Sequence, residues 1–120
     1  MFDLNSLDAE LKQLKAQTLS EYGKKIEIAI EMLKKKGRVL AREKKILEKA
    51  KTRYSKGSFF RRKFFKELME RVIKKINMLE CEIERLKNLK EKYIADYKTQ
   101  REYLGIYDHD FIDRFFENKN

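Results

Sequence analysis

The sequence predicts an all-α fold class: a long antiparallel helical hairpin, meaning a two-helix coiled coil, followed by a short C-terminal helix. Three observations predict it. Apolar residues recur every three or four positions almost throughout the chain, which is the spacing of helices with one buried stripe. The 120 residues include no proline and four glycines. Charged residues make up 42%, against roughly 25% in ordinary globular proteins, as is typical of long helices with exposed faces.

The first element is a helix over residues 4–54. Gly23 and Gly37 interrupt its pattern, but each costs a helix only about 1 kcal/mol relative to alanine, so we expect one continuous helix. A helix that breaks at either glycine and folds back on itself is the alternative. The predicted buried stripe consists of Leu4, Leu7, Leu11, Leu14, Tyr22, Ile26, Ala29, Leu33, Leu40, Leu47 and Tyr54.

A turn at residues 55–58 follows. Gly57 suits the position after a helix end, where a left-handed backbone is needed, and Ser58 suits the N-cap of the next helix. The second helix covers residues 59–104 and is nearly as long as the first, so the two helices should pair, with the hairpin tip near Lys56. Its predicted stripe consists of Phe60, Phe64, Leu68, Val72, Ile76, Leu79, Ile83, Leu86, Tyr93, Tyr97 and Leu104.

The C-terminal segment predicts a helix end and a short helix. Gly105 favours a Schellman-type end for the second helix. Asp108 or Asp110 can then cap a short amphipathic helix over residues 110–117. The whole chain, residues 1–120, is expected to form one elongated helical-hairpin domain, since domains usually have about 100–150 residues.

Near the tip, apolar residues cover a wider arc of both helices than one neighbouring helix can bury. We expect a second copy of the chain to cover the rest, giving a dimer that forms a four-helix bundle near the tip; a different protein is the alternative. The oligomer-interface candidates are Ile28, Met32, Val39, Ile46, Phe65, Met69 and Ile73. Farther along, Lys90 lies in the narrow seam between the helices, where it either fixes their register or extends its ammonium to solvent.

Positive charge is concentrated in the middle of the chain. Residues 23–75 hold 20 basic and 6 acidic residues, a net charge of +14, whereas residues 1–22 and 76–120 carry −2 each. Seven of the bases, spaced three or four apart, form a line opposite the apolar stripe of the first helix, a footprint typical of polyanion binding. This basic line consists of Lys35, Arg38, Arg42, Lys45, Lys49, Arg53 and Lys56. Around the tip, the positive surface continues with Arg61, Arg62, Lys63 and Lys66. A charged solvent face alone would also account for the line.

Four phenylalanines accompany these bases. Phe60, Phe64 and Phe65 fall on the apolar arc of the second helix, and we interpret them as core residues. Phe59 falls off that arc and is the candidate for an exposed contact. Aromatic rings among basic residues could also stack on unpaired nucleobases.

The sequence contains no enzyme motif. It has no Gly-rich phosphate loop, nucleophile elbow or His-Glu metal motif, so we expect no catalysis, no cofactor and no small-molecule substrate. His109 lies near Asp108, Asp110 and Asp113, but charges at a helix N-terminus explain these carboxylates better than a metal site does. Cys81 is the only cysteine, which excludes an internal disulfide, and we interpret it as a spare thiol.

The sequence also bears on location. No apolar run approaches the roughly 20 residues that span a bilayer. The first ten residues, MFDLNSLDAE, lack the basic and apolar regions of a signal peptide. Together with the single cysteine, these features make a cytoplasmic location the expectation.

The expected function is that of a non-enzymatic coiled-coil interaction or assembly module, with a strongly basic tip half that binds an acidic partner. The alternative is a nucleic-acid-binding protein that grips phosphates through the basic helix face. Binding of the Phe-, Lys- and Arg-rich tip to a membrane surface is a third and weaker hypothesis.

Overall fold

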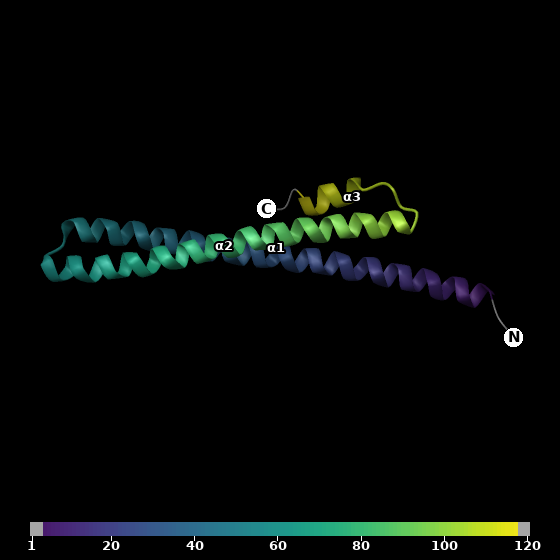
Figure 1. Ribbon diagram of the computed structural model, residues 1–120, viewed down its shortest axis with the longest axis horizontal. Helices are drawn as coiled ribbons and strands as arrows, with labels where there is room; N and C mark the ends of the chain where they lie inside the picture. Colours follow the sequence, from purple (N-terminus) through teal and green to yellow (C-terminus); the bar gives the residue numbers. More distant parts are fainter. Residues whose placement is uncertain (1–3, 118–120) are drawn as a thin grey trace. The chain divides into compact units, whose positions relative to one another are not determined.

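The computed structural model describes residues 4–117, and this part of the chain is helical, with no strand. Two long helices, α1 (Leu4–Lys56) and α2 (Phe59–Tyr103), precede a short helix, α3 (Asp110–Ile112), and a π-helical turn, η1 (Asp113–Glu117) (Figure 1). The prediction of an all-α chain with two long helices and a short C-terminal one is confirmed.

Helix α1 is continuous through both of its glycines, so the broken-helix alternative is wrong. A Cβ atom added at Gly23 or Gly37 would meet no atom within 4 Å. Neither glycine is therefore required by close packing, and the helix tolerates their weak propensity because its stripe is buried elsewhere along its length.

The contacts divide the chain into two compact units, which we describe separately. The hairpin unit is Met32–Leu86, and the terminal unit combines Met1–Glu31 with Lys87–Asn120.

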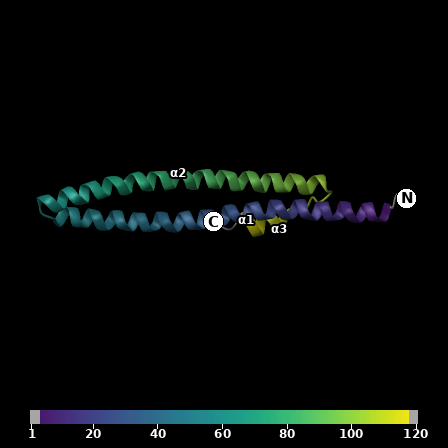
Figure 2. The same cartoon turned by 90° about the horizontal axis from the view of Figure 1, so that it is seen from below.

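In the hairpin unit, α1 and α2 run antiparallel, since later residues of α1 pair with earlier residues of α2. Lys36 Nζ lies 2.7 Å from Glu82 Oε2, and Glu43 Oε1 lies 2.8 Å from Lys75 Nζ. Both views of the ribbon show the two segments side by side (Figures 1 and 2). The buried apolar residues between them are Ala50, Val72, Ile76 and Leu79.

The seam between these helices is not purely apolar. Leu33, Leu40 and Leu47 are half-buried on α1, as the stripe predicts. The heptad positions between them are Lys36 and Glu43, and both are joined to α2 by the ion pairs described above. Salt bridges therefore replace apolar contacts at the two seam positions where the apolar pattern of α1 is interrupted.

The turn differs from the prediction at one residue. Ser58 acts as the N-cap, because its carbonyl accepts the first α2 hydrogen bond, from Arg62 N–H at 2.8 Å. Gly57, however, does not have the left-handed backbone that we expected; Gly105 has it, with φ of 87°. A Cβ at Gly57 would lie 3.0 Å from Arg61 Cβ and 3.1 Å from the Arg53 carbonyl oxygen, so the close approach of the two helix ends favours glycine there.

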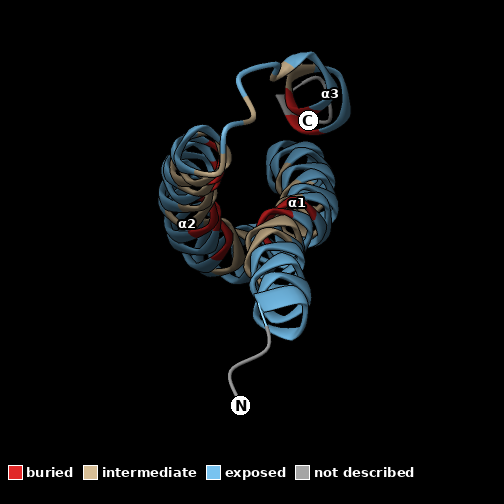
Figure 3. Cartoon of the chain, turned by 90° about the vertical axis from the view of Figure 1, so that its right-hand side faces the viewer, coloured by how far each residue is buried: buried red, intermediate tan, exposed pale blue. Residues whose placement is uncertain are grey.

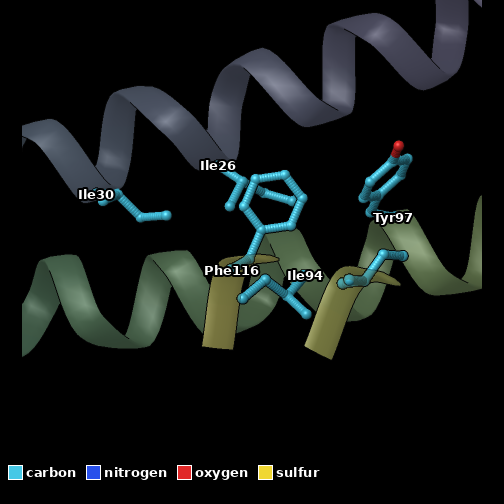
Figure 4. Packing of buried hydrophobic residues seen from close by; sticks show 6 residues of the cluster. Ile26, Ile30, Ile94, Tyr97 and Phe116 are labelled. Carbon is cyan, nitrogen blue, oxygen red and sulfur yellow. The ribbon is translucent and has the colours of Figure 1, made fainter. Parts of the chain in front are cut away.

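The terminal unit has its own core, drawn from α1, α2 and the C-terminal segment (Figure 4). The Tyr97 ring lies parallel to Tyr22, with centroids 6.3 Å apart, and meets Phe116 edge-on at 6.3 Å. Phe116 is thus packed against both long helices of this unit. The buried cluster consists of Ile26, Ile30, Ile94, Tyr97, Ile112 and Phe116.

A Schellman end returns the chain toward this core. Ile106 N–H donates to the Arg101 carbonyl oxygen at 2.8 Å, and Gly105 N–H donates to that of Glu102 at 3.0 Å, which confirms the predicted helix end. The Arg101 guanidinium then donates to the carbonyl oxygen of Asp108 at 2.8 Å. An ion pair of 2.6 Å between Lys98 Nζ and Asp113 Oδ1 fixes the following turn to α2.

The first turns of α1 are not part of the core, contrary to the predicted stripe. Because Tyr22 stacks on Tyr97 in an antiparallel pair, the last α2 residue, Tyr103, lies level with Ala16. Residues before Ala16 have no α2 residue opposite them, and α1 visibly continues past the end of α2 (Figures 1 and 2). These turns are exposed in the end-on view (Figure 3). The exposed stripe residues are Leu4, Leu7, Leu11 and Leu14.

Lys90 is buried within the terminal unit, with 5% of its surface exposed. It lies on the predicted seam beside the half-buried Tyr93. This burial argues against an ammonium that extends far into solvent, and the role of Lys90 in fixing the register stays a prediction.

Candidate interaction surface at the hairpin turn

The basic line lies on the solvent face of α1, as predicted: all seven of its residues are exposed. Within residues 4–117, none of the seven forms a salt bridge with a carboxylate. Lysines that flank the seam behave differently, since Lys36, Lys44 and Lys75 each pair with a glutamate of the other helix. Three carboxylates of the hairpin unit, those of Glu43, Glu80 and Glu82, therefore pair across the two helices, and none pairs with the basic line within the described residues.

The charge of the two units follows this division. The hairpin unit contains 19 basic and 7 acidic residues, a net charge of +12, whereas the terminal unit contains 11 and 13, a net charge of −2. Positive charge is thus concentrated on the hairpin unit.

A pocket of about 570 Å³ lies at the turn of the hairpin unit. Its walls combine aromatic rings with the side chains of two arginines and a lysine, so apolar and cationic groups face the same space. The pocket is lined by Thr52, Arg53, Lys56, Gly57, Phe60, Arg61, Phe64 and Phe65. Of these residues, the sequence predicts Arg53, Lys56 and Arg61 as partner-binding residues and Phe65 as an oligomer-interface residue.

The interpretation of Phe60 and Phe64 as core residues is wrong. Phe60 is 80% exposed and Phe64 is 55% exposed, whereas Phe65 is half-buried. Phe60 lies in the first turn of α2, directly after the hairpin turn, where α1 ends at Lys56 and leaves the ring exposed. Phe64 also lies about 80° around α2 from Val72, on the flank of the seam. The sequence signal for their exposure is their position, since both residues lie within two helical turns of the hairpin turn.

Phe59 is 77% exposed, as expected, and contacts Phe60 edge-on with centroids 5.7 Å apart. Next to it, Arg61, Lys63 and Lys66 are exposed. Arg62 is exposed too, and its guanidinium carbon lies 5.9 Å from the centroid of Tyr54. The structure therefore brings the predicted tip residues together around one turn.

The oligomer-interface candidates all lie at the surface of their units. Ile28, Met32 and Ile73 are exposed, and the other four, Val39, Ile46, Phe65 and Met69, are half-buried beside the seam. One flank of the apolar arc is thus left open in the single chain. Exposed apolar flanks of this kind are typical of surfaces that meet another protein.

The remaining chemical candidates are accounted for by local contacts. His109 Nε2 lies 3.0 Å from Glu102 Oε1, and the Asp108 carboxylate accepts a hydrogen bond of 3.0 Å from the N–H of Asp110. Among residues 4–117, no group of three or more His, Cys, Asp or Glu side chains could hold a metal ion. Cys81 is exposed with a free thiol. None of the helices in the described part of the chain is both long enough and apolar enough to cross a membrane.

Comparisons with known proteins give no match among protein-family models, curated proteins or solved structures. The residues around the hairpin turn offer a surface for non-covalent binding: cations to pair with carboxylates or phosphates, and aromatic rings to receive an apolar group.

Proposed function

We propose that this chain is a non-catalytic assembly module whose hairpin unit binds an acidic partner. One observation carries the proposal: a basic line without internal ion pairs leads directly to the pocket at the turn, where Arg53, Lys56 and Arg61 adjoin exposed phenylalanine rings. Cations left unpaired in the chain are available to an incoming anion without first breaking a salt bridge. Acidic protein segments that carry apolar side chains match both halves of this surface.

The module is further proposed to self-associate as a dimer, with the open apolar flank of each hairpin unit facing its counterpart in a four-helix bundle. Met32 and Ile73, both exposed, supply the accessible part of that flank. A cytoplasmic location belongs to the same proposal, since the one cysteine, Cys81, is a free thiol.

Nucleic-acid binding is the second candidate, favoured by the same basic line together with Phe59, whose exposed ring is free to stack on an unpaired base. Its predicted signature is affinity for single-stranded oligonucleotides that falls linearly in the logarithm of salt concentration.

Fluorescence anisotropy tests both candidates with two labelled probes: a peptide that alternates glutamate with leucine and phenylalanine, and a single-stranded oligonucleotide. The line variant carries Arg38→Glu, Arg42→Glu, Lys45→Glu and Lys49→Glu. The control makes the same change in net charge on exposed residues of the terminal unit, with Lys24→Glu, Lys87→Glu, Lys92→Glu and Arg114→Glu.

We expect the peptide to bind the wild type, and the line variant to bind it about tenfold or more weakly, while the control changes little. The double variant with Phe60→Ala and Phe64→Ala should weaken peptide binding without a change in salt dependence, because it removes apolar contact alone. Equal losses in the line variant and the control would contradict the proposal, as would the absence of binding at low salt. Tight binding of the oligonucleotide alone would favour the second candidate.

A further inference from the structure

The first turns of α1 carry an apolar face that the rest of the described chain leaves open. Four leucines, here called the leucine stripe, lie on these turns and are between 37% and 71% exposed: Leu4, Leu7, Leu11 and Leu14. They lie beyond the last residue of α2, so α2 does not cover them. None of the four positions of the leucine stripe carries a charged side chain.

The spacing of the stripe is that of a coiled-coil seam. Steps of three, four and three residues place Leu4 and Leu11 at heptad position a, and Leu7 and Leu14 at position d. Such a seam is too narrow for a helix packed among several neighbours, but it is sufficient for one partner helix. The occupant is thus a single helix with a matching stripe.

The charges beside the stripe indicate which helix this is. Glu10 falls at position g and Lys15 at position e of the same heptad frame. Asp8 falls at the other e position of these turns, where its g counterpart, residue 3, lies outside the described residues, and it pairs with Lys12 of its own helix. In a parallel coiled coil, a g residue meets the e residue five positions later on the other helix, so Glu10 would face Lys15 of a second copy, and the symmetric contact would form as well. Both residues are exposed, and within residues 4–117 neither has an ion pair that such a contact would have to break.

We propose that the leucine stripe is a self-association site, at which two copies of this chain form a parallel two-stranded coiled coil. The stripe belongs to a helix of 53 residues, so its turns extend an existing helix and do not have to nucleate a new one. Association then requires no folding of the partner and buries only side chains that are open in the single chain. The site is distinct from the apolar flank proposed above for the hairpin unit.

Disulfide trapping tests the pairing and its direction. In a Cys81→Ser background, Leu11→Cys places a thiol on the seam, and Ala9→Cys places one on the outer face of the same turns as a matched control. A parallel, in-register pair brings position 11 next to its own counterpart, so mild oxidation should give a covalent dimer with Leu11→Cys and little with Ala9→Cys. An antiparallel pair would separate the two thiols. No dimer from Leu11→Cys, or equal dimer from both variants, would overturn the proposal.

Sedimentation equilibrium over a concentration series tests the chemistry of the interface, in a Met32→Glu and Ile73→Glu background that removes the hairpin-unit dimer proposed above. Glu10→Lys alone and Lys15→Glu alone should each weaken association about three- to tenfold, because each creates two like-charge contacts per dimer, whereas the two changes together should restore it. Leu7→Glu with Leu11→Glu should abolish it, and circular dichroism should show unchanged helix content, since both leucines are exposed in the single chain.

A second variant separates this site from the proposed hairpin-unit dimer. Met32→Glu with Ile73→Glu should leave the disulfide-trapped Leu11→Cys dimer in place. If instead that variant abolishes all association and the leucine variants abolish none, the leucine-stripe proposal is wrong and the hairpin-unit dimer stands. A chain that stays monomeric at every concentration would contradict both proposals.

Discussion

At the scale of single residues, Glu43 is the clearest departure from a simple apolar seam. It is 6% exposed, and its carboxylate pairs at 2.8 Å with Lys75, whose own side chain is about half exposed. A buried carboxylate gains little net stability from a partner that remains solvated, but it loses much when that partner is removed. Its contribution is thus better described as fixing which residues face each other than as strengthening the hairpin.

Two changes at this pair should therefore have opposite effects. Lys75→Ala should lower the free energy of unfolding by about 1 kcal/mol, because the Glu43 carboxylate stays buried without its partner. Glu43→Leu should raise it by about 1 kcal/mol, because an apolar side chain at this position would extend the contacts that Leu40 and Leu47 make in the seam. Urea denaturation followed by far-UV circular dichroism measures both. Lys74→Ala, at an exposed neighbouring lysine, is the control, and a loss of stability in Glu43→Leu would mean that the ion pair contributes net stability.

The sequence predicted the surface bases better than the aromatic residues, for a physical reason. Exposure of Arg38 or Lys49 follows from helical periodicity alone, since those residues lie opposite the stripe. Exposure of Phe60 depends on where the neighbouring helix ends, which periodicity does not encode. The same limit explains Leu14, whose spacing is that of a buried residue although α2 stops before reaching it.

At the scale of whole elements, the glycines divide into two classes. Gly37 lies in the interior of α1, is exposed, and has open space where a Cβ would be. Gly105 ends α2 with φ of 87°, a conformation that residues with a Cβ rarely adopt. The first is a weak point of its helix, and the second is required by the Schellman end that directs the chain toward the terminal-unit core.

Alanine substitutions should therefore shift stability in opposite directions. Gly37→Ala should stabilise the chain by about 0.5–1 kcal/mol through helix propensity, and Gly105→Ala should destabilise it by about 1 kcal/mol through backbone strain. Differential scanning calorimetry should show a higher melting temperature for the first variant and a lower one for the second. Equal shifts in the two variants would be incompatible with the positive φ at Gly105.

Helix lengths and ends were predictable because each boundary has its own local chemistry. The second helix was expected over residues 59–104 and extends over Phe59–Tyr103, because Ser58 and Gly105 mark its ends. The position of the C-terminal segment was not predictable, since it depends on how Phe116 packs against Tyr97 and on the ion pair of Lys98 with Asp113. Contacts between elements of this kind leave no periodic signal in the sequence.

At the scale of the whole molecule, the uneven charge is a cost that the fold does not offset internally. The hairpin unit carries a net charge of +12, and its seven-residue basic line has no salt bridge within the described residues. Like charges spaced one helical turn apart repel each other, whereas the seam ion pairs that oppose this effect are fewer. This repulsion should consequently lower the free energy of unfolding of the unbound chain.

Added salt should therefore stabilise the chain. Raising sodium chloride to about 0.5 M, where charges are screened over only a few ångströms, should increase the melting temperature of the wild type. The line variant, with Arg38→Glu, Arg42→Glu, Lys45→Glu and Lys49→Glu, should melt higher than the wild type at low salt and respond less to added salt, because four changes of two charges each lower the net charge of the hairpin unit from +12 to +4. Calorimetry at several salt concentrations measures both effects, and a melting temperature that falls with salt in the wild type would show that the seam ion pairs dominate instead. If the line variant is more stable than the wild type but no longer binds the acidic peptide, then the basic line lowers the stability of the free chain and favours a bound state. This is the behaviour expected of a surface retained for a partner.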